Sequence, residues 1–198
     1  ERRKTALEKS LMLKNALMQC IPLYSTSVSP IRMLSPSRGQ TGAFTGNIED
    51  LSKKAFRKAG RFCLDFGEHR VGYLSFTVIP IGDIPDAPAY LHIKFGEKLC
   101  EILESSSTYT GSLSQGWIQE EYLHIDFLPQ HIELPRRYAF RYIEIEILDT
   151  SEAYQISFQN IACRTVSSGI FDNVPAYPLL DPVLQQLDST SIKTLHEC

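Results

Sequence analysis

An alternation of apolar and polar residues through the middle of the chain limits the folds that it can adopt. Apolar side chains occupy every second position in five segments, which contain Phe62, Leu64 and Phe66; Leu74, Phe76 and Val78; Leu91, Ile93 and Phe95; Leu123, Ile125 and Phe127; and Ile143, Ile145 and Ile147. This period is typical of strands that bury one face, because helices repeat their apolar residues every three or four positions. A sixth strand is expected from Ile156 to Cys163 or Val166.

Loops, and not helices, separate these strands. Gly67 is expected to end the first strand, Pro80 to Pro88 is expected to be a loop, and residues 101–119 form a long polar stretch. One-sided alternation with loop connections favours antiparallel pairing. We therefore predict a mainly β fold, an antiparallel β-sandwich of jelly-roll type, with residues 120–127 and 134–148 as its central strand pair.

Both ends of the chain are expected to be helical. Residues 1–20 and 179–196 carry apolar residues at helical spacing, and a short helix is expected at Ile48–Ala59. The segment from Ile21 to Ala43 has the Ser, Pro and Gly content of a loop. These patterns predict three regions: a basic N-terminal segment at 1–60, a β-sandwich domain at 61–168, and a linker with a helix at 169–198.

Charge and hydropathy exclude several classes of protein. Residues 1–60 carry 11 Lys and Arg against 4 Asp and Glu, but few aromatic residues lie between these charges, so no nucleic-acid partner is predicted. No apolar run approaches the ~20 residues of a membrane span, and Glu8, Lys9 and Lys14 interrupt any signal peptide. The five scattered cysteines lack a C-x-x-C pair, which predicts reduced thiols in a cytoplasmic protein, with no metal site and no cofactor.

No arrangement of residues indicates catalysis. The acidic pair Glu144 and Glu146 is expected on the solvent face of its strand, and His92 and His124 are expected at the surface. The five histidines are dispersed and show no metal-ligand or nucleophile-base spacing. We therefore predict no catalytic residue in this chain.

Aromatic residues around the polar stretch suggest a binding role. Trp117, Tyr109 and Tyr122 lie in or beside this stretch, and aromatic rings contact the apolar faces of sugars well. These three residues are the candidates for carbohydrate binding, with rhamnosides or other glycans as ligands. The other possibility for Trp117, a residue that fills the core or a domain interface, stays open.

Arg141 is the strongest structural candidate. Its neighbours Ala139, Phe140 and Ile143 are apolar, and an arginine buried among them requires a carboxylate partner. Asp65 and Glu97 both lie at ends of predicted strands. We expect Arg141 to join two strand ends through an ion pair with one of them.

Three short motifs occur in an order that resembles a known family. They are D-F-G followed by G-Y within 64–73, F-G-E within 93–98, and F-R-Y at 140–142. Together these motifs resemble the β-sandwich domain that precedes the catalytic domain of bacterial α-L-rhamnosidase-like glycoside hydrolases of family 78. The segment from Leu180 to Leu195 is similar to the first helix of the α/α toroid that follows this sandwich.

The resemblance implies an accessory domain, a fragment of a larger hydrolase. It places the catalytic acids in the toroid, so the chain alone is expected to be inactive, and its partner is its own catalytic domain. It also implies that six residues are framework positions, namely Asp65, Gly67, Gly72, Gly96, Glu97 and Arg141. Residues 1–60 lie outside the resemblance. The alternatives are a separate carbohydrate-binding module and a protein-interaction module that uses the basic segment, and exposed helices would favour homo-oligomers.

Overall fold

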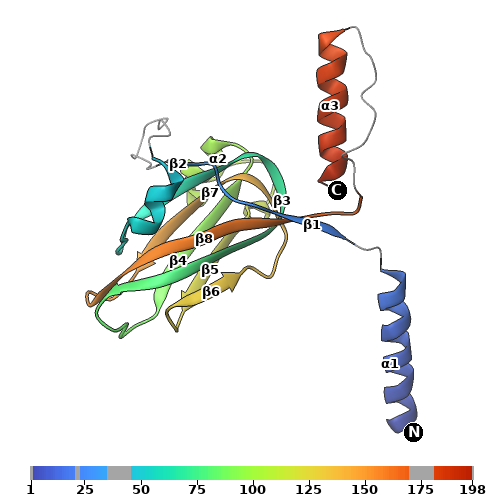
Figure 1. Ribbon diagram of the computed structural model, residues 1–198, viewed down its shortest axis with the longest axis horizontal. Coiled ribbons are helices and arrows are strands. Elements are labelled where there is room, and N and C mark those ends of the chain that lie inside the picture. Colours follow the sequence, from blue (N-terminus) through green and yellow to red (C-terminus); the bar gives the residue numbers. More distant parts are fainter. Residues whose placement is uncertain (1, 21–22, 35–45, 170–180, 198) are drawn as a thin grey trace. The chain divides into compact units, whose positions relative to one another are not determined.

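The computed structural model describes residues 2–20, 23–34, 46–169 and 181–197 (Figure 1). The chain divides into two compact units, one formed by residues 1–25 and 166–198 and the other by residues 26–165. The division predicted at residues 60 and 168 remains a prediction about the domains of the longer protein.

An antiparallel sheet dominates the second unit. Its strands are β1 (Tyr24–Val28), β2 (Arg32–Leu34), β3 (Arg61–Gly82), β4 (Ala89–Gly96), β5 (Glu120–Ile125), β6 (Gln130–Glu133), β7 (Tyr138–Asp149) and β8 (Tyr154–Ser167). They follow the order β1-β8-β3-β7-β4-β5, and β2 and β6 also pair with β3. Because β3 pairs antiparallel with β2, β6, β7 and β8, and β4 does so with β5 and β7, the predicted antiparallel fold is confirmed.

Strand β3 pairs with different strands along its length. Its first part, Arg61–Asp65, pairs with β7 and, over Cys63–Asp65, with β2; farther along, Ser75–Val78 lies between β6 and β8. The register with β7 shifts between Asp65 and Arg70, where Gly67 has a φ of 82°. Bulges of this kind let one strand turn from one layer of a sandwich into the other. Gly67 was expected to end a strand; it bends a longer one.

The alternating residues form the core as predicted. Phe62, Leu64 and Phe66 are buried, as are their counterparts on β4 and β7. Aromatic rings fill much of this core: Phe62 lies 5.1 Å from Phe158, and Phe95 stacks on Tyr138 at 4.0 Å between ring centroids. Burial of each such side chain stabilises the folded state by roughly 1.5–3 kcal/mol relative to an exposed side chain. Phe127 is an exception, because β5 ends at Ile125 and the Phe127 side chain is 81% exposed.

Several elements differ from the sequence prediction. β5 and β7 are not partners, because β4 pairs with both of them. The predicted loop at 21–43 contains β1 and β2, which alternation could not reveal since β1 is almost wholly exposed and β2 has three residues. The predicted helix at Ile48–Ala59 is only a short 3-10 helix, η1 (Ile48–Lys53). It ends early because the Phe56 backbone forms hydrogen bonds with Ile156.

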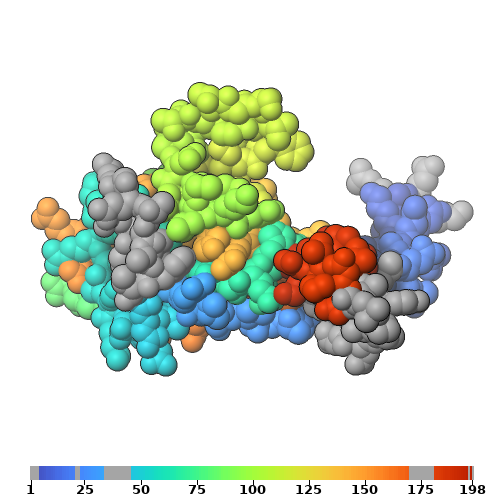
Figure 2. Space-filling model, turned by 90° about the horizontal axis from the view of Figure 1, so that it is seen from above, coloured from blue at the N-terminus to red at the C-terminus, as the bar shows by residue number. Residues whose placement is uncertain are grey.

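The stretch at 101–119 is more ordered than predicted. It holds the helix α2 (Leu99–Leu103) and two 3-10 turns, η2 (Ser106–Thr108) and η3 (Gln115–Trp117). Ile102 of α2 is fully buried and packs with Cys63 of β3. Figure 2 shows this segment in yellow-green, where it projects from the domain. It covers part of the outward face of the β4 and β7 layer.

The first unit contains the helices α1 (Arg2–Gln19) and α3 (Pro182–His196). In α1, Ser10 and Lys14 lie among Leu7, Leu11 and Met18 on one face, so the apolar face is interrupted. In α3, Asp181 caps the first turn by accepting a hydrogen bond from the Val183 N–H at 2.8 Å. The first residues of the predicted C-terminal helix, 179–180, lie outside the described residues. No helix in the described ranges is long and apolar enough to cross a membrane.

Candidate functional site

Asp65 is the centre of an ion-pair cluster on β3. Its side chain is fully buried, and its carboxylate accepts hydrogen bonds from Arg141 Nε at 2.9 Å and from Arg141 Nη2 at 3.2 Å. Arg32 of β2 donates to the same carboxylate at 2.6 Å. The Gly67 N–H supplies a further bond, at 2.8 Å. The partner of Arg141 is therefore Asp65, and the cluster links β2, β3 and β7.

The cluster favours the charged form of Asp65. Burial alone would raise the pKa of this carboxyl, but the hydrogen bonds from Arg141, Gly67 and Arg32 outweigh burial and hold the pKa below its usual value. The bulge at Gly67 serves the same site, because it turns this N–H toward Asp65. The cluster is suited to a structural role, because both carboxylate oxygens of Asp65 already accept hydrogen bonds from protein donors.

Glu97, the other candidate partner of Arg141, has a different role. Its side chain is exposed and lies 3.3 Å from His69 Nε2. Close neighbours explain why positions 72 and 96 are glycines. A Cβ at Gly72 would lie 2.3 Å from the Arg164 carbonyl oxygen, and a Cβ at Gly96 would lie 2.9 Å from Ile102.

Glu144 lies on the outward face of β7 and β4, and the prediction that it is exposed to solvent is wrong. Its side chain is buried and pairs with Arg61 at 3.4 Å, with Lys94 acting on it electrostatically. Burial raises the pKa of the Glu144 carboxyl, and Lys94 and Arg61 oppose this rise. The sequence placed Glu144 on a solvent face because nothing in it indicated that α2 and its flanking turns pack there. The same burial, with Glu144 nearby, raises the pKa of the Cys63 thiol to about 12.

His92 is buried as well, contrary to the prediction. Its Nε2 lies 3.0 Å from Glu120 and its Nδ1 lies 3.8 Å from Glu146. The Tyr122 ring stacks on the imidazole at 4.3 Å between centroids, with 9° between the planes. Tyr122 therefore covers His92 on the β4 and β5 face, whereas His124 stays exposed and stacks on Tyr90.

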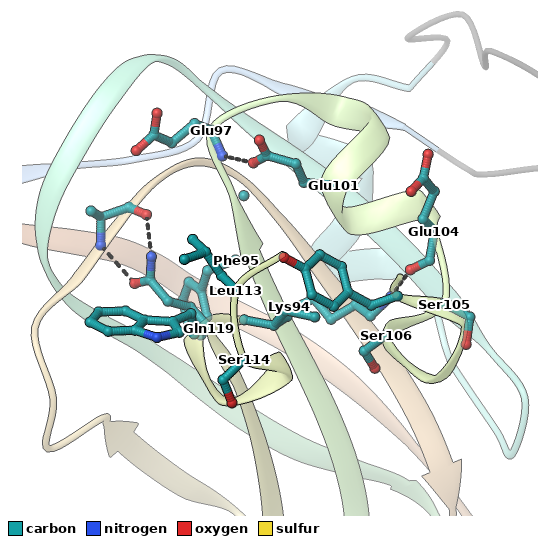
Figure 3. Close-up of a pocket in the computed structure, with 15 residues that line it drawn as sticks. Lys94, Phe95, Glu97, Glu101, Glu104, Ser105, Ser106, Leu113, Ser114 and Gln119 are labelled. Atoms are coloured by element: carbon teal, nitrogen blue, oxygen red, sulfur yellow. Dashed lines mark hydrogen bonds between the residues drawn. The ribbon is translucent and has the colours of Figure 1, made fainter. Parts of the chain in front are cut away.

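A cavity lies beneath the 99–119 segment, as Figure 3 shows. It has a volume of about 550 Å³, and both Trp117 and Tyr109 line it. Glu97 and Glu101 lie along its upper edge in Figure 3, opposite Ser106 and Ser114. Tyr122 is absent from its lining, so the structure brings together two of the three aromatic candidates.

Buried polar groups hold the walls of this cavity. Lys94 Nζ donates to the carbonyl oxygen of Ile102 at 3.2 Å and to that of Glu104, at the end of α2. Glu120 accepts from Ser106 of η2 at 3.1 Å. Gln119 exchanges two hydrogen bonds with the Ala139 backbone, both at 3.1 Å. Lys94 of β4, Glu120 of β5 and Gln119, which directly precedes β5, thus hold the 99–119 segment in place. This segment has little regular secondary structure of its own.

The described ranges hold no metal cluster, and two of their four cysteines are buried. No cluster of three His, Cys, Asp or Glu side chains there could hold a metal ion. Cys20, Cys63, Cys100 and Cys163 are free thiols, and the second and fourth are buried. Burial raises the pKa of the Cys163 thiol to about 12 also, so neither buried thiol is reactive at neutral pH.

Comparison with known proteins places the chain among glycosidase domains. Residues 38–165 match the family model described as the glycosyl hydrolase family 78 alpha-rhamnosidase N-terminal domain. A rhamnosidase from Klebsiella oxytoca, solved with rhamnose bound, shares 32% identity and a TM-score of 0.83 over 94% of this chain. A family 78 rhamnosidase of Bacillus sp. GL1 matches 56% of this chain with 15% identity and a TM-score of 0.39. A comparison with curated proteins gave no match.

The chain covers only part of each enzyme that it matches. The chain spans 37% of the Klebsiella oxytoca rhamnosidase and 10% of the Bacillus enzyme. The sandwich fold and the resemblance drawn from the three motifs are confirmed. The expectation that residues 1–60 lie outside the resemblance is wrong for residues 38–60, because the family model begins at residue 38. Because the family model covers well over half of the sequence, this chain belongs to the family of glycosyl hydrolase family 78 alpha-rhamnosidase N-terminal domains.

Proposed function

We propose that this chain is the non-catalytic part of a rhamnosidase and supports a catalytic domain in the same polypeptide. The observation that carries the proposal is the Klebsiella oxytoca match, which covers 94% of this chain but 37% of that enzyme. The uncovered 6% is about a dozen residues, fewer than the 18 of α1 or the 15 of α3. Both helices therefore have counterparts, at least in part, in a complete rhamnosidase.

Helix α3 is the surface that best fits the catalytic partner. Val183, Leu184 and Leu187 lie on one face and are 72%, 47% and 62% exposed. An apolar helical face of this kind favours burial against another protein surface. Covering it with the catalytic domain removes this apolar face from water, whereas in the isolated chain the same face favours homo-oligomers. Within this proposal, a cytoplasmic location follows from the cysteine pattern and is tested by fractionating cells that express the complete reading frame.

The test compares the complete reading frame with residues 1–198. We expect the complete protein to hydrolyse an aryl α-L-rhamnoside and residues 1–198 to show no turnover. The remainder of the protein, expressed separately, should bind residues 1–198 and regain activity or thermal stability.

Substitutions on α3 make this test specific. Leu187→Asp should weaken the complex by about tenfold or more, because it buries a charge in an apolar interface. Ser189→Asp, on the polar side of the same helix, should leave the affinity unchanged. Turnover by residues 1–198 alone would contradict the proposal. Failure of the separately expressed remainder of the protein to bind residues 1–198 would also contradict it.

A second candidate role is direct contact with the glycan substrate. Trp117 and Tyr109 favour it, since both line the cavity beneath the 99–119 segment. Tyr122 does not share this position, because its ring covers His92.

A further inference from the structure

The cavity beneath the 99–119 segment has the composition of a saccharide site. Trp117 lies at its edge and is 76% exposed, and Tyr109 is 42% exposed. Aromatic side chains of this size offer roughly 150–250 Å² for contact. Phe95, Leu113 and Ile118 add apolar lining, and Ser105, Ser106 and Ser114 supply hydroxyl groups. Apolar ring faces together with short hydrogen-bonding side chains match the two sides of a pyranose ring.

The cavity has a fixed shape and a suitable size. Its volume of about 550 Å³ lies within the ~300–1,000 Å³ of typical ligand sites, enough for a saccharide of about two rings. Lys94, Gln119 and Glu120 hold its walls through side-chain hydrogen bonds. A wall ordered before binding reduces the entropy that a ligand must overcome.

The charges in the lining define the class of saccharide. Three acidic residues line the cavity, Glu97, Glu101 and Glu104, against one basic residue, Lys94. Lys94 is 7% exposed, and its Nζ donates to the Ile102 and Glu104 carbonyl oxygens. The Glu101 carboxylate accepts the N–H groups of Glu97 at 2.8 Å and Lys98 at 3.2 Å, which fixes it at the rim. An anionic sugar would meet like charges there.

We propose that this cavity is a subsite for neutral saccharides, with Trp117 as the stacking platform, and that its carboxylates reject uronic acids. The choice of rhamnosides as probes rests on the proposed function of the chain as part of a rhamnosidase. The binding itself is a property of residues 94–139 and can be measured on the chain alone.

The chain provides its own reporter for the test. Trp117 is the only tryptophan in the sequence, so its fluorescence reports on this cavity and on no other place. We expect a saturable change in emission when residues 1–198 are titrated with methyl α-L-rhamnoside or a neutral disaccharide of rhamnose and glucose. Digalacturonic acid, of similar size but anionic, should bind at least about tenfold more weakly at low salt. Equal affinity for the neutral and the anionic disaccharide would overturn the proposed selectivity.

Calorimetry on variants locates the site. Trp117→Ala should weaken the neutral disaccharide by about tenfold or more, as removal of a central aromatic contact does, and Trp117→Phe should recover part of the affinity. Phe127→Ala is the matched control, because Phe127 is an 81% exposed aromatic residue that does not line the cavity. Tyr122→Ala tests the β4 and β5 face instead.

The outcomes are distinguishable. Loss of affinity in Trp117→Ala, with Phe127→Ala and Tyr122→Ala unchanged, supports the subsite. Loss in Tyr122→Ala alone would place binding on the other face and overturn it, and so would the absence of heat and of any fluorescence change at millimolar sugar. None of these results alters the assembly test of the proposed function, which measures binding to the catalytic domain.

Discussion

At the scale of single residues, one buried carboxylate determines how three strands meet. Asp65 has no exposed side-chain surface, and its donors come from β2, β7 and its own bulge. Removing a donor leaves a buried charge partly unsatisfied, which is more damaging than the loss of a surface ion pair. Because Arg32 and Gly67 remain as donors when Arg141 is lost, the penalty should fall below that of a fully orphaned charge.

The first prediction concerns Arg141. Arg141→Met should lower the free energy of unfolding by about 1.5–3 kcal/mol, the range for hydrogen bonds to charged groups. Denaturant unfolding of the chain measures this. Lys58→Met is the control, since its pair with Asp149 is exposed on both sides and should be worth less than about 1 kcal/mol. Equal stability of the two variants would show that Arg141 does not hold the strands together.

The second prediction separates two buried carboxyls by pH. The folded pKa of Asp65 lies below its unfolded value of about 3.9, so its stabilising effect is complete above that pH and is lost as the pH falls through the folded pKa. The folded pKa of Glu144 lies above its unfolded value of about 4.3, so this group opposes folding at neutral pH, and less so as the pH falls through the folded pKa.

Unfolding measurements at several pH values, with Asp65→Asn and Glu144→Gln, test both signs. Relative to Asp65→Asn, the wild type should lose stability below about pH 4. Relative to Glu144→Gln, it should gain stability as the pH falls from 7 toward 4. Curves that move in the same direction for both variants would contradict the assignment of opposite pKa shifts.

At the scale of elements, β3 is the strand on which the others assemble, and Gly72 is its crossing point. Gly72 pairs with Tyr138 of β7 and with Thr165 of β8, and its Cα faces the Arg164 backbone. The Arg164 backbone of β8 cannot yield to a methyl group as a flexible side chain can. The glycine is therefore required by close approach, and its φ is not the reason.

The third prediction follows from this crossing. Gly72→Ala should lower the free energy of unfolding by about 3 kcal/mol or more, at the upper end of overpacking effects. Gly116→Ala is the control, because the nearest atom to its Cβ would be 3.6 Å away, and it should stay within about 0.5 kcal/mol of wild type. Thermal and denaturant unfolding report both; an unaffected Gly72→Ala would mean that β7 and β8 separate easily.

The fourth prediction concerns the 99–119 segment. Lys94→Met keeps the length of the side chain but removes the ammonium group that binds the Ile102 and Glu104 carbonyl oxygens. Amide hydrogen exchange within 99–119 should accelerate, while exchange in β3 and β7 stays slow. Lys98→Met, at an exposed neighbouring position, should change neither. If amide exchange in the segment were unchanged in Lys94→Met, the packing of Ile102 would be enough to keep the segment ordered.

The same segment explains where sequence prediction stopped. Alternation identified the cores of β3, β4, β5, β7 and β8, because burial of one strand face leaves a period of two. It failed for His92 and Glu144, since these residues face outward from the core and are buried by Tyr122 and α2, which come from elsewhere in the chain. It also gave no indication that Tyr109 and Trp117 would share a cavity while Tyr122 would not. For Arg141 the apolar sequence neighbours predicted a carboxylate partner but left Asp65 and Glu97 as alternatives, and only the structure, where the Arg141 side chain is 33% exposed, identifies Asp65.

At the scale of the whole molecule, the helices and the sheet have different requirements. The sheet domain has a buried apolar core, whereas α1 exposes Leu7, Leu11 and Leu17 and α3 exposes Val183 and Leu187. Surfaces of this kind favour association with a partner or with a second copy of the chain.

The fifth prediction is therefore concentration-dependent association of the isolated chain. Sedimentation should show dimers or larger species at micromolar concentrations, and Val183→Asp with Leu187→Asp should shift the chain toward monomers. Phe127→Asp, a charge at an exposed apolar residue of the sheet domain, should leave association unchanged. If the chain stayed monomeric at all concentrations, this prediction would be wrong.

Strand β3 also has a consequence for the order of synthesis. It is translated early, yet β7 and β8 follow only after β4, α2, β5 and β6. While the ribosome completes those elements, both edges of this 22-residue strand lack their main partners. Unpaired strand edges in nascent chains bind other strands and chaperones readily. The nascent domain should thus depend on chaperones until β8 emerges, and truncation before β8 should convert a folded domain into an aggregating one.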